Sequence, residues 1–204
     1  LAKGGNKDAV VKSALAEKIK ANVLEAKRAG LLAKTDLTTL LVGEFPELQG
    51  LMGYYYAMHD QEDMAVAQAL NEQYMPRFAG DELPHSSLGL ALSLADRIDT
   101  LVGTFAIGQK PTGDKDPFKL RRHALAVVRL LLSTESPLKL STLIEQSLEG
   151  YADLPLTASC LIELRPFILD RLNSHYQGMD VPQEIVQAVR ARQDDCLYDL
   201  NQRI

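Results

Sequence analysis

Apolar side chains recur at helical spacing along most of the chain, and this periodicity constrains the fold more than any other sequence feature. The clearest segment is 86–107. Its apolar residues recur three or four positions apart, with the neighbours Ala91 and Leu92 both in the set: Leu88, Ala91, Leu92, Ala95, Ile98, Val102 and Phe105. Residues with this spacing share one face of an α-helix. Valine, isoleucine and threonine do not alternate with polar residues over any useful length, so we expect no strands. The sequence therefore predicts an all-α fold.

Capping and breaking residues divide this pattern into separate helices. Ser86 or Ser87 can cap the helix over 86–107, and Asp116 followed by Pro117 is a strong helix start. Thr142 with Glu145 resembles a capping box. The other predicted helices cover 8–29 with a stop at Gly30, 31–43, 46–58, 61–75, 117–133, 142–150, 157–176 with a break at Pro166, and 180–192.

Composition indicates an ordinary globular chain that does not enter a membrane. The 204 residues are 46% apolar and 24% charged, which is enough to bury a sizeable core. No run of about 18 apolar residues is present, and the polar N-terminus does not resemble a signal peptide. Cys160 and Cys196 form neither a zinc motif nor a disulfide framework. We expect an internal piece of a longer cytoplasmic protein, with no membrane partner.

Two stretches of the sequence are distinctive enough to indicate a family. The first is 42–60, which contains Glu44, Phe45 and Pro46 and ends in His59 and Asp60. The second is 108–122, and 69–80 and 95–101 lie between them. In this order and spacing the stretches closely resemble the middle of the β subunits of bacterial tetrameric glycyl-tRNA synthetases. The resemblance covers residues 30–135 most strongly.

The resemblance implies a fold and a setting. It implies an HD-domain-like helical bundle. The sequence itself changes character near Ser136 and Pro137, and this change predicts an HD-like core over 1–135 followed by a C-terminal helical extension over 136–204. The partners would be the α subunit, which holds the aminoacylation site, the remaining β-subunit domains, and glycine tRNA. ATP and Mg²⁺ would serve the parent complex, and this part of the chain would need no cofactor. The setting would be cytoplasmic protein biosynthesis.

A degenerate metal site is one candidate for chemistry. In HD-type phosphohydrolases a His-Asp pair joins an earlier histidine and a later aspartate to hold a divalent metal that activates water. His59, Asp60 and Asp96 resemble three of these groups, but no histidine precedes His59, and Asp36 is at best a substitute. An incomplete ligand set is a poor metal site. We expect no metal and no catalytic residue, with a buried Asp96 hydrogen-bonded to His59. A metal-dependent phosphohydrolase is the alternative.

A basic segment is the second candidate. Its five cations lie within thirteen residues: Lys110, Lys115, Lys119, Arg121 and Arg122. A glycine-bearing loop leading into a helix N-terminus offers N–H groups to a phosphate, and lysine and arginine suit phosphate oxygens. Asp116 is expected to cap its own helix and so to take the anion position. The segment predicts either RNA or interdomain contact, or a solvated structural rim. The net charge of −5 favours a third interpretation, a purely structural connector.

Overall fold

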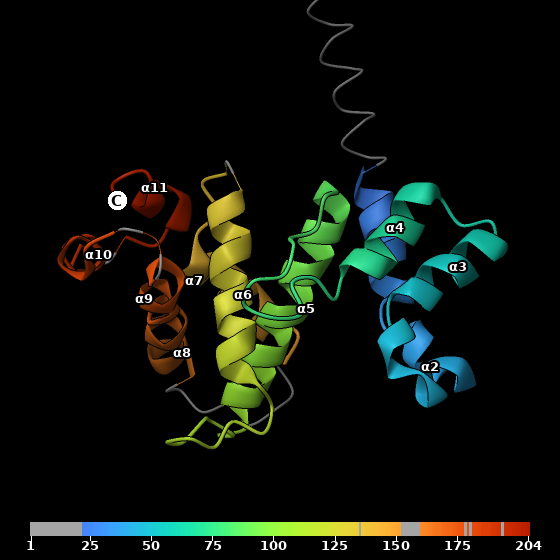
Figure 1. Ribbon diagram of the computed structural model, residues 1–204, viewed down its shortest axis with the longest axis horizontal. Helices are drawn as coiled ribbons and strands as arrows, with labels where there is room; N and C mark the ends of the chain where they lie inside the picture. The colour runs from blue at the N-terminus through green and yellow to red at the C-terminus, as the bar shows by residue number, and fades with distance from the viewer. Residues whose placement is uncertain (1–21, 135, 152–159, 178, 180, 193) are drawn as a thin grey trace, which may run out of the picture. The chain divides into compact units, whose positions relative to one another are not determined.

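A computed structural model describes residues 22–134, 136–151, 160–177, 179, 181–192 and 194–204 (Figure 1). Every named element in these ranges is a helix, and two isolated bridges are the only β features there. The predicted all-α fold is therefore confirmed, while the HD-like assignment stays a prediction. No helix in the described ranges is both long and apolar enough to cross a bilayer.

The chain forms two compact units. The first comprises the described residues up to Tyr74 together with Pro84–Leu92, and the second comprises Met75–Leu83 and Ser93–Ile204. The helix α5 (Ser87–Ala106) contributes to both units. The change predicted at Ser136 lies inside the second unit, and the division into 1–135 and 136–204 stays a prediction.

The first unit is built from short helices (Figure 1). Its elements are a helix over 22–32, η1 (Thr35–Thr38), α2 (Leu40–Glu44), η2 (Pro46–Leu48), α3 (Leu51–His59), α4 (Met64–Glu72) and the start of α5. The predicted stop at Gly30 is wrong, because two more helical residues bring Leu32 against the buried clusters around Ala29 and Ala57. The predicted helix over 31–43 is also wrong. Lys34 has a φ of 64°, which ends one helix before α2 begins.

Asp36 organises the backbone of this unit. Its side chain is buried, and its two carboxylate oxygens accept the Gly50 N–H and the Tyr74 hydroxyl, each at 2.7 Å. Gly50 has a φ of 84°, and a Cβ there would lie 2.9 Å from the Tyr74 ring. Only glycine suits this position, so the buried carboxylate and the glycine together fix the start of α3.

A second buried carboxylate, Glu72, holds the N-terminus of α5. It accepts the backbone N–H groups of His85 and Ser86, and the Ser86 hydroxyl also donates to it. The Ser86 oxygen accepts the Gly89 N–H at 2.9 Å, so the predicted serine cap is confirmed. α5 itself covers almost the whole predicted segment 86–107.

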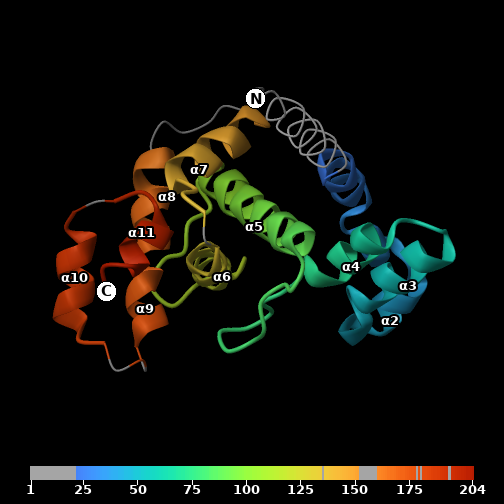
Figure 2. The same ribbon diagram turned by 90° about the horizontal axis from the view of Figure 1, so that it is seen from above.

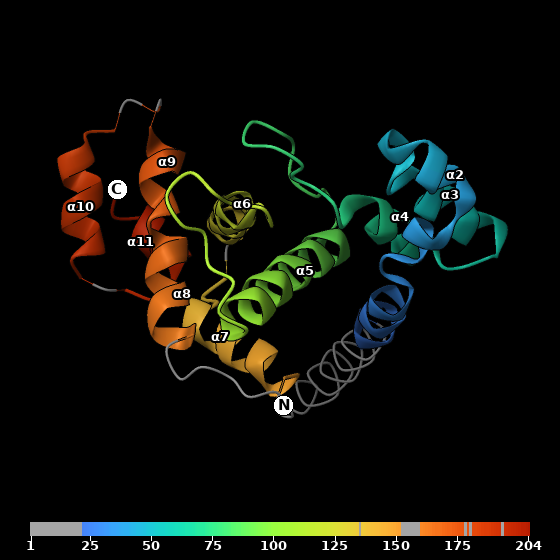
Figure 3. The same ribbon diagram turned by 90° about the horizontal axis from the view of Figure 1, so that it is seen from below.

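The second unit is arranged around α6 (Leu120–Ser133). The other helices are α7 (Leu140–Glu149), α8 (Cys160–Leu169), α9 (Arg171–Tyr176), α10 (Gln183–Arg190) and α11 (Leu197–Asn201). Figure 2 and Figure 3 show α6 end-on, with α5 on one side and α8 and α9 on the other. Half of the residues of α6 are buried: Leu120, Ala124, Ala126, Val127, Val128, Leu130 and Leu131. This central burial fixes which face of α6 remains for function.

Three predicted helix boundaries in this unit are corrected. α6 begins at Leu120, three residues after Pro117. α7 begins before Thr142, because Asp195 accepts the Leu140 N–H on its backbone and the Ser141 N–H on its carboxylate. No capping box is needed where a distant aspartate satisfies these donors.

The break expected at Pro166 falls instead at Asp170, between α8 and α9. Pro166 and Ile162 are both exposed, so water can satisfy the Ile162 carbonyl that proline leaves without a helical partner.

Replacing Asp36 should destabilise the first unit strongly. Asp36→Ala removes the carboxylate that accepts the Gly50 N–H and the Tyr74 hydroxyl, which we expect to cost about 2–4 kcal/mol of unfolding free energy. Urea denaturation measures the loss. Asp60→Ala, on an exposed side chain, is the control and should change stability by less than about 0.5 kcal/mol. An Asp36→Ala protein as stable as the control would show that this buried carboxylate does not organise the unit.

Candidate nucleic-acid interface

The residues of the predicted degenerate metal site do not form a buried cluster. His59 ends α3, and its Nδ1 lies 3.0 Å from the Oδ1 of Asp60, with the two side chains 86% and 71% exposed. Asp96 is partly exposed and lies on α5 in the second compact unit. In the described ranges no three histidine, cysteine, aspartate or glutamate side chains gather as metal ligands. The degenerate site therefore stays a prediction from resemblance.

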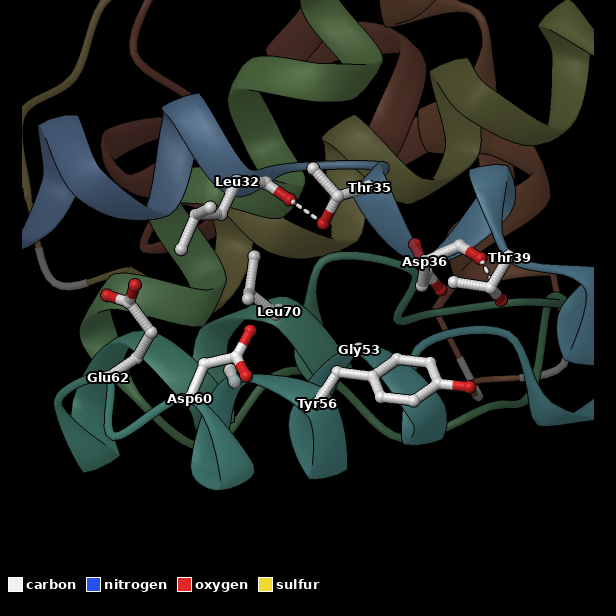
Figure 4. Close-up of a pocket in the computed structure, with 10 residues that line it drawn as sticks. Leu32, Thr35, Asp36, Thr39, Gly53, Tyr56, Asp60, Glu62 and Leu70 are labelled. Atoms are coloured by element: carbon white, nitrogen blue, oxygen red, sulfur yellow. Dashed lines mark hydrogen bonds between the residues drawn. The ribbon is translucent and has the colours of Figure 1, made fainter.

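A cavity of about 280 Å³ lies beside Asp60 in the first unit (Figure 4). Figure 4 shows Asp60 and Glu62 at one end and Asp36 near the other. Arg28 donates to Glu62 at 2.9 Å, and this hydrogen bond holds the pKa of Glu62 below its usual value. The carboxylate of Asp36 is already used by backbone and tyrosine donors. Two of the three acids thus have structural partners.

The basic segment forms a tight turn and a capped helix start. Thr112 and Lys115 exchange two backbone hydrogen bonds around Gly113, whose φ of 51° suits glycine. The Asp116 carboxylate then accepts the N–H groups of Leu120 at 2.8 Å and Arg121 at 2.9 Å. The prediction that Asp116 caps its own helix is confirmed. The N-terminus of α6 is therefore not open to an external anion.

The five predicted cations fall into two groups. Lys110 forms an ion pair with Glu163 of α8, and the Arg121 guanidinium donates to the Gly113 carbonyl. These two side chains stabilise the loop against its own unit. Lys115, Lys119 and Arg122 are exposed and have no ion pair with any residue in the described ranges. Their side chains are therefore open to a ligand from outside the chain.

The structure adds two arginines that the sequence prediction missed. A cavity of about 320 Å³ in the second unit is lined by Phe78 and by four arginines: Arg121, Arg122, Arg129 and Arg171. We call these five residues and the space they enclose the arginine cavity. Among the described residues, no acidic side chain lines it. The cavity therefore concentrates positive charge in a chain whose net charge is −5.

The α6 helix places three of the four arginines. Arg121 and Arg129 are eight residues apart, and Arg122 and Arg129 are seven apart, so two helical turns bring them to one face. This spacing is the signal that could have revealed Arg129 from the sequence. Arg171 begins α9, and only the packing of α9 on α6 brings it to the same cavity. No local pattern could have shown this.

Two of the cavity arginines, Arg129 and Arg171, have uncharged hydrogen-bond partners or a donor without an acceptor in the described ranges. Arg129 donates to the carbonyl oxygens of Phe78 at 3.3 Å and Asp81 at 2.6 Å. The Nε of Arg171 is buried and has no acceptor among the described residues. Burial, aided by the positive charge of Arg129, lowers the pKa of His175 on α9. Carbonyl partners leave the charge of Arg129 uncompensated, and the cavity can hold an anion.

The fold is all-helical, one cavity is lined by arginines, and three exposed cations lack ion pairs in the described ranges. These are the features of a helical module with an anion-binding surface. Residues 6–191 match the family described as glycyl-tRNA synthetase beta subunit. The glycine–tRNA ligase beta subunit of Colwellia psychrerythraea is 45% identical over 190 residues, which cover 93% of this chain and 28% of that protein. The same subunit of Alteromonas mediterranea is 49% identical over 178 residues, covering 87% of this chain and 26% of that one. The Pseudomonas aeruginosa subunit is 47% identical over 190 residues, with 93% and 28% covered.

The chain belongs to the glycyl-tRNA synthetase beta subunit family. It spans about a quarter of the length of these relatives. The resemblance inferred from 42–60 and 108–122 is thereby confirmed.

Removing the cap of α6 should loosen the basic segment. Asp116→Ala deprives the Leu120 and Arg121 N–H groups of their acceptor, which we expect to cost about 1–2 kcal/mol. Urea denaturation and amide hydrogen exchange at residues 116–122 would measure this. Asp114→Ala, in the same exposed loop, is the matched control. Equal protection of these amides in both variants would contradict the capping role.

The stability of the second unit should depend on His175 at mildly acidic pH. Folding lowers the pKa of His175, so below the unfolded value of about 6.5 the unfolded chain binds more protons than the folded one. The unfolding free energy should therefore fall as the pH falls from about 6.5 toward the lowered pKa. His175→Gln should flatten the pH dependence of the unfolding free energy. Urea titrations at pH 7.5 and 5.5, each roughly one unit from the unfolded-state pKa, would measure this. An unflattened His175→Gln curve would contradict the assignment.

Proposed function

We propose that this chain takes part in glycine–tRNA ligation as a tRNA-contacting part of the glycyl-tRNA synthetase β subunit, without an active site of its own. The observation that carries the proposal is the set of exposed cations Lys115, Lys119 and Arg122, which lack ion-pair partners in the described ranges. Such side chains suit the phosphate backbone, which dominates the affinity of proteins for nucleic acid. The family membership of the chain supports tRNA as the nucleic acid.

The partners follow from the same proposal. The α subunit would hold the aminoacylation site, with its ATP and Mg²⁺, and the remaining β-subunit domains would complete the tRNA surface in the cytoplasm. The geometry at His59 supports a non-catalytic role, because this side chain is exposed and pairs with its neighbour Asp60. Asp36, the substitute for the absent histidine, is used by Gly50 and Tyr74. These contacts speak against the alternative of a metal-dependent phosphohydrolase.

A structural connector is the second candidate, and a specific observation favours it. Lys110 and Arg121 satisfy partners inside their own unit, Glu163 and the Gly113 carbonyl. Part of the basic segment thus stabilises the fold. A connector would keep these interactions and would show no salt-dependent affinity for RNA.

A titration of the chain with glycine tRNA at about 50 and 200 mM salt separates the two candidates. The proposal predicts binding that weakens with salt, and a preference for glycine tRNA over an unrelated tRNA would add base-specific recognition. Lys115→Gln with Lys119→Gln should flatten the logarithmic salt dependence by about 0.9 for each phosphate that the variant no longer binds. Removing two exposed lysines outside the loop, Lys27→Gln with Lys139→Gln, is the matched control. No binding at the lower salt would favour the connector.

A further inference from the structure

We propose that the arginine cavity binds phosphate groups of a single-stranded RNA segment and that Phe78 stacks on an unpaired base beside them. This inference rests on the proposed function for the choice of RNA. It goes further by naming the residues, which the basic loop alone does not include. Two of the four arginines, Arg129 and Arg171, lie outside the segment that the sequence singled out.

The charge of the cavity favours an anionic ligand. Among the described residues, the lining includes four guanidinium groups and no carboxylate. The acid closest in sequence to Phe78 is Asp81, and its carboxylate accepts the Arg77 backbone N–H at 2.6 Å. The paired N–H donors of a guanidinium group match the geometry of phosphate oxygens. Guanidinium is also more weakly hydrated than ammonium, so it loses less hydration when it binds a ligand. Four arginines around one concave surface therefore favour a phosphate-bearing ligand.

One of the arginines that line the cavity has a donor without an acceptor in the described ranges. Of the four arginines, Arg121 and Arg129 donate to backbone carbonyls. Arg122 is exposed without an ion pair in the described ranges, and the Nε of Arg171 is buried without an acceptor there. A buried donor without a partner is unfavourable, so the described residues do not fully satisfy the guanidinium of Arg171. The cavity is thus incomplete as an internal hydrogen-bond network.

An aromatic wall distinguishes the cavity from a simple anion site. Phe78 is 60% exposed although it lines the cavity, and Arg129 holds its backbone carbonyl. An exposed ring next to cations is the combination with which proteins bind single strands, because any base can stack on the ring while phosphates meet the charges. The cavity volume of about 320 Å³ is at the lower end of the range for small-molecule sites. It suits a nucleotide-sized group. A duplex, whose bases are already stacked, would leave Phe78 without a partner.

The test uses the 204-residue chain and a fluorescein-labelled octauridylate, with affinity measured by anisotropy at several salt concentrations. Arg122→Gln with Arg171→Gln should weaken binding at least about tenfold and flatten the logarithmic salt dependence by about 1.4, which corresponds to two phosphates of a single strand. Phe78→Ala changes an exposed side chain and should keep the fold. It should weaken octauridylate binding at least about fivefold and leave the salt dependence unchanged. Lys27→Gln with Lys139→Gln has the same change in charge outside the cavity and should bind as the wild type does.

The outcomes separate this inference from the proposed function. If tRNA binds but octauridylate does not, or if the control pair loses as much affinity as the cavity pair, the arginine cavity is not the site, whatever the tRNA titration shows. An octaglutamate peptide is the competing probe. If the peptide binds as tightly as octauridylate and its affinity is unchanged in Phe78→Ala, the cavity is a binding site for an acidic protein segment. The inference is then overturned. We expect octauridylate binding to weaken in both cavity variants and to stay unchanged in the control pair.

Discussion

The burial of α6 is the constraint on which the second unit depends. Half of its residues are buried, and the helix packs against α8, α9 and α11. Once this apolar side is covered, the orientation of the helix is fixed, and its remaining side carries Arg121, Arg122 and Arg129 into one cavity. The same packing brings Arg171 of α9 to that cavity. The hydrophobic core and the candidate interface are therefore two sides of one helix, and a change that rotated α6 would disturb both.

Carboxylates that accept N–H groups from residues far away in the sequence fix the positions of the backbone segments. Asp36, Glu72 and Asp195 each accept N–H groups from residues at least thirteen positions away in the sequence. In each case the carboxylate satisfies donors that a helix or turn leaves without internal partners. Such acids are expensive to bury unless they are hydrogen-bonded, so their pairing and the local fold support each other. These hydrogen bonds explain how the short helices, several of which have fewer than ten residues, keep defined positions.

Local chemistry accounts for what could be predicted from the sequence. The periodicity over 86–107 predicted α5 almost to its ends, and the caps at Ser86 and Asp116 were predicted from residue type alone. Prediction failed where distant residues decide. The start of α7 is set by Asp195, which no nearby residue reveals, and Gly30 remains helical because Leu32 packs on the core. For the site, Arg121 and Arg122 were recognised, Arg129 was recoverable from helical spacing, and Arg171 required the tertiary packing of α9 on α6.

If RNA meets this part of the β subunit at the arginine cavity, the residues that line the cavity must lie next to the bound strand. The most direct measurement is photo-cross-linking of the chain to single-stranded RNA containing 4-thiouridine, with the attached peptides mapped by mass spectrometry. We predict cross-links at Phe78 and on peptides from the exposed side of α6 or the start of α9. Cross-links confined to the first unit, around His59 and Asp60, would contradict this placement of the RNA.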